Sequence, residues 1–202
     1  IHNINSLAND KDIKLEDRAK IAMRKFTRLS ESEVVTPEFI ADKMINALPD
    51  KEIKTSTKIL DIASKQGEFV YAIYKKFGEK IANNVYSIPT SKAAYEFTRK
   101  IYESLGLKVE NIEKDYTSYH LIENNRIING KNVKINDMSM KFDVIVGNPP
   151  YQESISSSSA NKSLSKQLFP SFIMTCVKLD STYLSLITPS RWFTGDAQDR
   201  SF

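Results

Sequence analysis

The chain is poor in the residues that build metal centres and disulfide frameworks. It has one cysteine, Cys176, and two histidines, His2 and His120, among 202 residues. A single cysteine excludes an internal disulfide framework and a cysteine zinc cluster. So few histidines also disfavour histidine-based catalysis or metal binding. We therefore expect no metal site and interpret both histidines as surface residues.

Long apolar runs are also missing. No stretch approaches the roughly 18 apolar residues that a membrane-spanning helix needs, and the N-terminal region shows no secretory signal. Together with the single cysteine, these features predict a cytoplasmic protein with no membrane partner. The chain begins at Ile1 rather than at Met and ends at Phe202, and we interpret it as a fragment of a larger protein.

The composition is that of an ordinary globular protein. Hydrophobic residues make up 41% and charged residues 27%, and 202 residues can bury one good core. The net charge of +4 and the isoelectric point near 9.0 suit contact with phosphates. Many proteins without a nucleic-acid role are equally basic, so the charge permits such a partner without requiring it.

Apolar strands and helices alternate along residues 58–188. Strands are expected at 58–62, 84–88, 108–112, 144–146 and 183–188, and helices at 68–77, 91–105 and 167–179. This alternation predicts a parallel sheet with helices on both faces. Asn129-Gly130 predicts a two-residue hairpin turn, and the Ser-rich residues 153–165 predict a flexible segment.

The N-terminal part is expected to be helical. A helix over 11–29 is predicted by an apolar stripe that consists of Leu15, Ala19, Ala22, Phe26 and Leu29. The rest of this helix surface is basic, and it is either a solvated face or a phosphate-contacting surface. Thr36 as N-cap and Pro37 at the first helical position predict a second helix, through about Leu48.

The most informative segment follows the strand at 144–146. The strand stops at Gly147, and the chain continues as Asn148-Pro149-Pro150-Tyr151. The prolines fix φ and remove two backbone donors, so the segment cannot continue as sheet. An amide, nearby carbonyls and a flat ring suit a planar group that carries an amino group, such as adenine. A plain Pro-Pro turn after a core strand is the alternative interpretation.

This segment resembles motif IV of amino-group DNA methyltransferases, in particular the gamma-class N6-adenine enzymes of restriction–modification systems (type II/IIG methylase domain). The resemblance implies that Asn148 and the Pro149 carbonyl accept hydrogen bonds from the adenine N6 amino group, within the catalytic tetrapeptide completed by Pro150 and Tyr151. Tyr151 would stack on a base flipped out of the duplex. The cofactor implied is S-adenosyl-L-methionine.

The resemblance also implies a fold and a domain organisation. The fold is the Rossmann-like α/β fold of class I methyltransferases, with a doubly wound, mostly parallel sheet and an N-terminal helical extension. We expect a helical segment at 1–30 and the catalytic domain at 31–202, with the target-recognition domain outside this chain.

Residues 61–69, Asp-Ile-Ala-Ser-Lys-Gln-Gly-Glu-Phe, resemble motif I of the same family. The resemblance implies that Asp61 holds the methionine ammonium end of the cofactor and that Gly67 lets the backbone approach it. Ala63 and Phe69 complete the motif. Lys65 departs from the family pattern, where glycine is more usual. An ordinary loop between a strand and a helix is the alternative.

Other cofactor positions are less regular. No acid follows the strand at 84–88, where the family commonly binds the ribose hydroxyls, so Ser87 or Thr90 is expected to do so. Asp115 is expected to contact the adenine ring of the cofactor, with Asp137 as the other candidate.

The segment 34–38 resembles motif X, in which Thr36, followed by Pro37, would help to enclose the methionine carboxylate at the start of a helix. Motifs X, I and IV are followed by 186–193, which is similar to a later family strand, so the resemblance covers about 30–193. Because ligands bind at the carboxyl ends of parallel strands, Asp61 and Asn148 are expected at one edge.

The resemblance implies a site-specific, adenine-specific DNA methyltransferase of a restriction–modification system. Its expected partners are double-stranded DNA and a fused or separate nuclease and target-recognition domain. A protein glutamine N5-methyltransferase stays open, because a side-chain amide is another planar amino group. A non-catalytic, methyltransferase-like module that binds DNA also stays open, because of Lys65 and the missing ribose acid.

Overall fold

A parallel sheet forms the centre of the molecule. The computed structural model describes residues 13–25, 34–123, 127–151 and 167–190. The sheet has the order β2-β1-β6-β7 and consists of β1 (Ile59–Ser64), β2 (Val85–Pro89), β6 (Val144–Gly147) and β7 (Tyr183–Leu186). Ile112 extends this order beyond β2 through one parallel bridge to Ser87. The result is the strand order of a Rossmann-like, doubly wound fold, with its switch point between β1 and β6.

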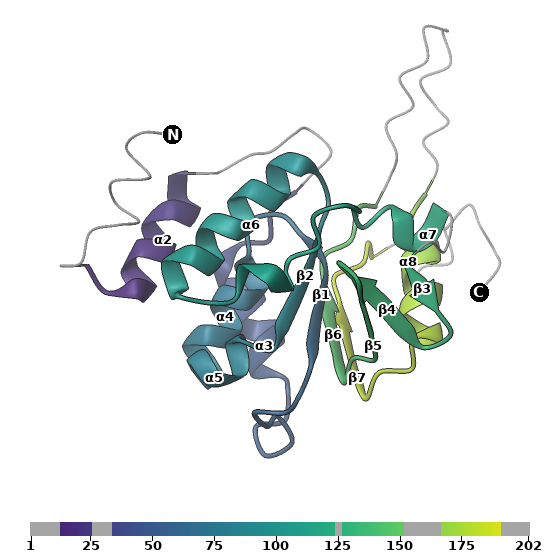
Figure 1. The fold of residues 1–202 in the computed structure, drawn as a ribbon, viewed down its shortest axis with the longest axis horizontal. Coiled ribbons are helices and arrows are strands. Elements are labelled where there is room, and N and C mark those ends of the chain that lie inside the picture. The colour runs from purple at the N-terminus through teal and green to yellow at the C-terminus, as the bar shows by residue number, and fades with distance from the viewer. Residues whose placement is uncertain (1–12, 26–33, 124–126, 152–166, 191–202) are drawn as a thin grey trace, which may run out of the picture.

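The two central strands are covered on both faces. All residues of β1 and β6 are buried, as expected where a parallel sheet has a layer on each side. Val144 and Val146 contribute to one hydrophobic core and Ile145 to the other. Figure 1 shows the sheet between one group of helices and a second group of helices and strands.

Helices cover the first face of the sheet. They are α2 (Leu15–Lys25), α3 (Glu38–Asn46), α4 (Glu68–Phe77), the short α5 (Glu79–Ala82) and α6 (Lys92–Leu105). Ala19 and Ala22 of α2 belong to the same core as the sheet residues. The predicted N-terminal helix is therefore confirmed over its described part, whereas Phe26 and Leu29 lie outside the described residues.

Helix α6 begins and ends as its sequence predicts. The Ser91 hydroxyl accepts a hydrogen bond from the Ala94 amide at 3.1 Å, and Gly106 ends the helix with φ 69°. A serine N-cap and a left-handed glycine satisfy the backbone groups at the two helix ends.

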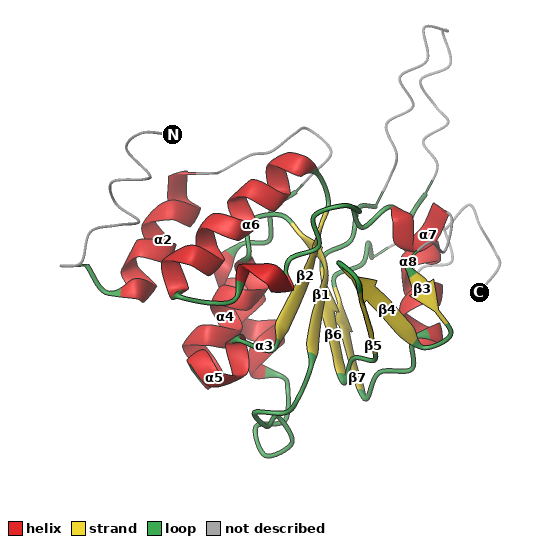
Figure 2. Ribbon diagram, viewed as in Figure 1, coloured by secondary structure: helices red, strands yellow, loops and turns green. Residues whose placement is uncertain are grey.

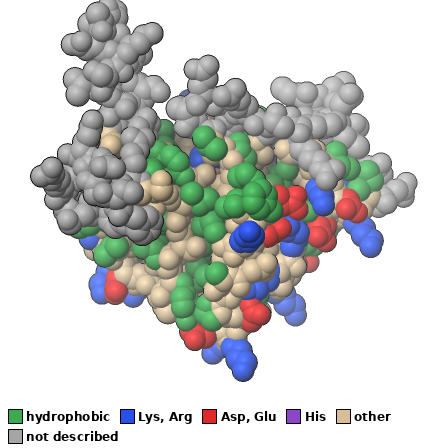
Figure 3. Space-filling model, turned by 180° about the vertical axis from the view of Figure 1, so that it is seen from behind, with side chains coloured by type: hydrophobic (Ala, Val, Ile, Leu, Met, Phe, Trp, Pro, Cys, Tyr) green, Lys and Arg blue, Asp and Glu red, His purple; other side chains and the backbone are tan. Residues whose placement is uncertain are grey.

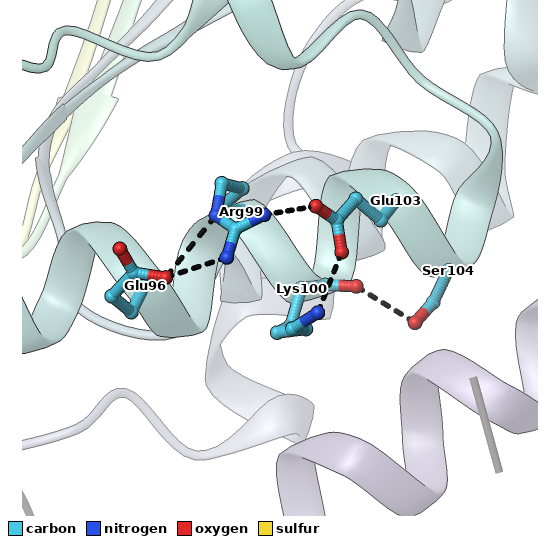
Figure 4. Close-up of polar contacts among 5 residues, drawn as sticks. All are labelled: Glu96, Arg99, Lys100, Glu103 and Ser104. Atoms are coloured by element: carbon cyan, nitrogen blue, oxygen red, sulfur yellow. Dashed lines mark hydrogen bonds and ion pairs between the residues drawn. The ribbon is translucent and has the colours of Figure 1, made fainter. Parts of the chain in front are cut away.

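The outer face of α6 carries a short series of ion pairs (Figure 4). Arg99 pairs with Glu96 at 2.7 Å and with Glu103, and Lys100 pairs with Glu103 at 2.9 Å. These i,i+3 and i,i+4 pairs support the helix. Because the side chains are partly exposed, each pair contributes less than about 1 kcal/mol to stability. The Ser104 hydroxyl donates to the Lys100 carbonyl one turn back.

A mixed layer covers the second face (Figure 2). It contains α7 (His120–Glu123), α8 (Phe169–Lys178) and an antiparallel sheet of β3 (Ile128–Asn129), β4 (Asn132–Ile135) and β5 (Met138–Met140). Val133 and Phe172 pack with Ile145 of the central sheet. Helices thus lie on both faces, as predicted, and the insertion at 128–140 contributes buried side chains to this core.

The predicted strand at 108–112 is wrong. A 3₁₀ helix occupies Val109–Asn111, and Ile112 alone bridges to β2. The Asn111 side-chain amide donates to the carbonyls of Asn83 and Val85 at 2.9 and 3.2 Å. A side chain therefore satisfies a β2 carbonyl that a strand backbone would otherwise satisfy.

The hairpin prediction is confirmed with a one-residue shift. Asn129 pairs with Asn132, so the two-residue loop is Gly130-Lys131 rather than Asn129-Gly130. Gly130 has φ 60° at the first loop position, which is where a type II′ turn requires glycine. The Ser-rich segment 153–165 lies outside the described residues.

Candidate active site at the carboxyl edge of the sheet

The ends of β1 and β6 lie side by side. Asp61 of β1 is in register with Val146 of β6, so the loops that follow both strands leave the sheet at one edge, here termed the carboxyl edge. A Cβ on Gly147 would lie 2.8 Å from Cγ1 of Ile62. Glycine is therefore required for the strands to approach this closely just before the Asn148 turn.

Asn148 has a buried side chain whose two amide atoms are both engaged. Its Nδ2 donates to the Thr36 hydroxyl at 3.2 Å and to the Val34 carbonyl at 3.3 Å. Its Oδ1 accepts a hydrogen bond from the Tyr151 hydroxyl at 2.8 Å. Since a backbone carbonyl can only accept, the Val34 contact determines which amide atom is the nitrogen. The amide orientation therefore follows from its surroundings.

Thr36 does not cap α3, so that prediction is wrong. Pro37 is the N-cap residue of α3, and no side chain caps the helix. The Thr36 side chain is buried and accepts from Asn148 instead. This contact joins the motif X-like segment to the motif IV-like turn, which sequence reasoning missed because 112 residues separate the two.

Tyr151 is anchored next to Asn148. Its carbonyl accepts a hydrogen bond from the Leu168 amide at 2.9 Å, just before α8. Burial raises the pKa of Tyr151, so its hydroxyl stays protonated and can donate. An amide oxygen has two lone pairs, so Asn148 Oδ1 can accept a second hydrogen bond. No hydrogen bond between described residues uses the Pro149 carbonyl, and Pro149 and Pro150 are both buried.

Asp61 is a buried carboxyl group with one unpaired oxygen. Its Oδ1 accepts from the Ala63 amide at 3.3 Å, whereas Oδ2 has no hydrogen-bond partner among the described residues. Burial, followed by repulsion from Glu68, raises the pKa of Asp61 to about 8. Ser64, the Ala63 amide and Lys65 act in the opposite direction. A ligand with a cationic donor would supply a partner for Oδ2 and would favour the ionised carboxylate.

Lys65 connects the β1 loop to the Asn148 turn. Its Nζ donates to the carbonyls of Val34 and Asn148, each at 2.8 Å. Glu68 accepts hydrogen bonds from the amides of Gln66 at 2.9 Å and Thr36 at 3.4 Å. The departure from the family pattern at Lys65 was the sequence signal for this contact, but its partners were not predictable.

Gly67 and Phe69 hold the start of α4. Gly67 is the N-cap residue and is left-handed, with φ 73° and ψ 25°. The left-handed backbone favours glycine here, and a Cβ at this position would lie 3.1 Å from Ile101 Cβ, so that Ile101 in α6 would have to shift. Phe69 is fully buried in the core between sheet and helices. The cofactor contacts of Gly67 and Phe69 remain predictions.

A cavity of about 280 Å³ lies beside the residues that follow the C-terminal end of β2 and those that follow Ile112. Its lining includes Pro89, Ser91, Tyr95, Glu113, Asp115 and Tyr116. The buried Glu113 accepts from the amides of Asp115 and Tyr116 at 2.8 and 3.3 Å and so shapes the loop. Asp137, in contrast, is fully exposed and pairs with Lys134 at 3.4 Å. Of the two candidate acids, Asp115 is the one beside this cavity.

Thr90, rather than Ser87, lies at the carboxyl edge. The Thr90 amide donates to the Ser64 carbonyl at 3.1 Å, and its buried hydroxyl has no partner among the described residues. The Ser87 hydroxyl is bonded to the Tyr102 hydroxyl at 3.0 Å inside the core. The structure therefore favours Thr90 over Ser87 for contact with ribose.

A comparison with protein families identifies the chain. The Eco57I restriction-modification methylase family matches residues 83–202, more than half of the chain. The chain belongs to the Eco57I restriction-modification methylase family. Within this family match lie the cavity beside Asp115 and the Asn148 turn, whereas the segment at Thr36 and the loop at Asp61 precede it.

One curated protein is similar in sequence to part of this Eco57I-family chain. An "Uncharacterized adenine-specific methylase" from Mycoplasma pneumoniae is 44% identical over 59 residues, which are 29% of this chain and 14% of that protein. The chain thus spans a small part of this relative's length. No solved structure matches the chain.

The described part of the Eco57I-family chain has three further features, which concern membrane-spanning helices, metal sites and surface charge. In the described ranges no helix is long and apolar enough to cross a membrane, and no three His, Cys, Asp or Glu side chains there form a metal site. Figure 3 shows that basic and acidic side chains are interspersed on the described part of the face turned away in Figure 1.

Proposed function

We propose that this chain is the catalytic part of a site-specific, adenine-specific DNA methyltransferase of a restriction–modification system. It would transfer the methyl group of S-adenosyl-L-methionine to N6 of an adenine flipped out of the duplex. The observation that carries the proposal is the oriented Asn148 amide, whose oxygen faces Tyr151 and keeps a free lone pair. Membership of the Eco57I family supports it.

The cofactor would bind between the β1 loop and the cavity beyond β2. Asp61 Oδ2 is a buried carboxyl oxygen without a hydrogen-bond partner among the described residues, and in its ionised form it suits the methionine ammonium group. Thr90 suits the ribose hydroxyls and Asp115 the adenine ring. Five further residues would complete the cofactor site. They lie in the segment before α3 and between the end of β1 and the start of α4, and they are Thr36, Pro37, Ala63, Gly67 and Phe69. When bound, the cofactor supplies the methyl group.

Asn148 and Tyr151 would act on the target base. Asn148 Oδ1 and the Pro149 carbonyl each accept a hydrogen bond from one N–H group of N6. These bonds place the nitrogen lone pair in line with the methyl carbon. These acceptors would stabilise the positive charge that develops on N6 while the new N–C bond forms and the methyl–sulfur bond of the sulfonium breaks, with the neutral thioether as the leaving group. The nitrogen then releases one proton to water. The Tyr151 ring stacks on the flipped base.

The proposed partners and location follow from this function. The substrate is double-stranded DNA, and a target-recognition domain and a nuclease, fused or separate, would accompany the catalytic domain. Methylation of this kind acts on DNA in the cytoplasm of a bacterial-type cell. The division into a helical segment at 1–30 and a catalytic domain at 31–202 belongs to the same proposal.

Nucleoside mass spectrometry tests the proposed reaction. The complete protein that contains this chain is incubated with unmethylated genomic DNA and S-adenosyl-L-methionine, and the DNA is then digested. N6-methyladenine is the expected product. Asn148→Ala should abolish it while leaving cofactor affinity, measured by calorimetry, nearly unchanged. Asn84→Ala is the matched control, because this amide binds the Thr55 carbonyl at the opposite edge of the sheet.

Other outcomes would contradict the proposal. Methyl-glutamine on a protein substrate, without methylated DNA, would establish the amide-methylating alternative. No cofactor binding at millimolar concentration, together with retained DNA binding, would establish a non-catalytic module.

A further inference from the structure

Lys65 is a buried lysine at the meeting point of three chain segments. Its side chain belongs to the β1 loop and is 2% exposed. Its Nζ lies 2.8 Å from the carbonyl oxygens of Val34 and Asn148, which are 31 and 83 residues away in the sequence. One ammonium group therefore joins the β1 loop, the segment before α3 and the catalytic turn.

Neighbouring carboxyl groups make a buried ammonium acceptable at this place. Asp61 and Glu68 are both buried in the same loop region, and Lys65 acts on Asp61 by direct electrostatic attraction. An unpaired buried cation would be costly, whereas this one has carbonyl acceptors and acidic neighbours. The cation in turn offsets the repulsion between the two acidic groups.

The Asn148 carbonyl is a sensitive point for such a contact. The next residue is Pro149, whose ring fixes φ, and the residue before it is Gly147, which packs against Ile62. The peptide bond between Asn148 and Pro149 therefore has little rotational freedom, apart from the direction in which the Asn148 carbonyl points. A donor on that carbonyl determines how the Asn148 side chain leaves the backbone.

We propose that Lys65 is a positioning residue for methyl transfer, which sets the Asn148-Pro149 acceptors at the distance that the target amino group requires. The inference rests on the proposed function. Thr36 orients the end of the Asn148 side chain, and Lys65 holds its backbone. A displacement of about 1 Å at such a site can cost roughly a hundredfold in rate, so Lys65 contributes to turnover rather than to cofactor affinity.

The chain offers a matched control for Lys65. The Nζ of Lys76 also donates to backbone carbonyls, those of Ile45, Asn46 and Leu48, at 3.1, 3.3 and 3.1 Å. These carbonyls lie at the end of α3, away from the carboxyl edge. Lys76→Met therefore removes the same kind of contact without touching the proposed site.

The test compares Lys65→Met and Lys76→Met in the complete protein. The readouts are the single-turnover rate of adenine methylation at saturating cofactor, the cofactor Kd by calorimetry and the thermal midpoint. Lys65→Met should lower the rate about tenfold or more and keep Kd within about threefold. Lys76→Met should keep the rate near wild type, even if its thermal midpoint falls as far as that of Lys65→Met. If Lys65→Met does not fold, the test is repeated with Lys65→Gly, because glycine is the residue usual at this position in the family.

Two results would overturn the inference. One is a single-turnover rate in Lys65→Met or Lys65→Gly no lower than in Lys76→Met. The other is a large rise in Kd with an unchanged rate at saturation, which would make Lys65 a cofactor-binding residue.

Hydrogen exchange separates this inference from the proposed function. If the wild-type protein methylates no adenine, the proposed function fails, but the contact can still be tested. Amide exchange at Gly147, Asn148 and Tyr151 should then accelerate in Lys65→Met and not in Lys76→Met. Equal exchange in both variants would show that Lys65 does not hold the turn.

Discussion

The Asn148 side-chain amide donates to the Thr36 hydroxyl across 3.2 Å, although 112 residues separate the two in the sequence. The contact is buried, and the Val34 carbonyl reinforces it at 3.3 Å. Because both partners accept from Nδ2, the amide oxygen is turned toward Tyr151. The segment that precedes α3 thereby takes part in the geometry of the proposed acceptor for the target amino group.

Thr36→Val should slow methyl transfer by roughly 5- to 50-fold, because the amide nitrogen of Asn148 loses an acceptor and its orientation loosens. Thr36→Ser keeps the oxygen and should stay close to wild type. Single-turnover methylation at saturating cofactor measures both. Thr57→Val is the control, since that buried hydroxyl accepts from the Lys54 amide far from the carboxyl edge. A higher cofactor Kd at an unchanged rate would instead assign Thr36 to the cofactor alone.

Substitutions of Tyr151 should separate stacking from hydrogen bonding. Tyr151→Ala should weaken the flipped-base state by about 1–3 kcal/mol, the usual contribution of base–aromatic stacking. Tyr151→Phe keeps the ring and removes the donor to Asn148 Oδ1, so base flipping should be preserved. A fluorescent base analogue at the target position reports the flipped state. Equal fluorescence for wild type and Tyr151→Ala would exclude stacking on this ring.

Asp61 should make the cofactor-free protein less stable as the pH rises. Its pKa is raised from 3.8 to about 8 in the folded state, so between these values the folded state binds more protons than the unfolded state. The free energy of unfolding should therefore decrease from about pH 4 toward pH 8 through this group. Asp61→Asn cannot ionise and should remove that part of the slope. Urea unfolding across this pH range measures it, and parallel curves for the two proteins would contradict the assignment.

Gly67→Ala should be more destabilising than Gly106→Ala. The two glycines share a left-handed backbone, with φ 73° and ψ 25° for Gly67 and φ 69° and ψ 24° for Gly106. Each substitution should cost about 1–2 kcal/mol for that conformation. At Gly67 the new Cβ would also meet Ile101 at 3.1 Å, whereas at Gly106 its nearest neighbour is 4.0 Å away. Overpacking should add about 1 kcal/mol or more at Gly67. Equal unfolding free energies would show that Ile101 moves aside.

Elements with strong local signals were predictable. Helix α4 spans Glu68–Phe77, as the apolar pattern and the preceding glycine predict, and α6 begins at its Ser91 cap and ends at Gly106. The region at 108–112 was not predictable, because a β-like sequence competes there with the side chain of Asn111, which donates to the Val85 carbonyl of β2. The roles of Thr36 were open for the same reason: a hydroxyl at a helix start can serve the helix or a distant partner.

Periodicity, turn residues and the Asn148-Pro149-Pro150-Tyr151 segment are local properties, so the amino-acid order was sufficient for the alternating α/β fold and for the candidate catalytic turn. The tertiary structure decided which groups face that turn. Lys65 reaches Asn148 across 83 residues of sequence, and this contact exists because β1 and β6 are neighbours in the sheet. Strand order and burial together determine such contacts, since a polar group that is removed from water must find whichever partner the fold places beside it.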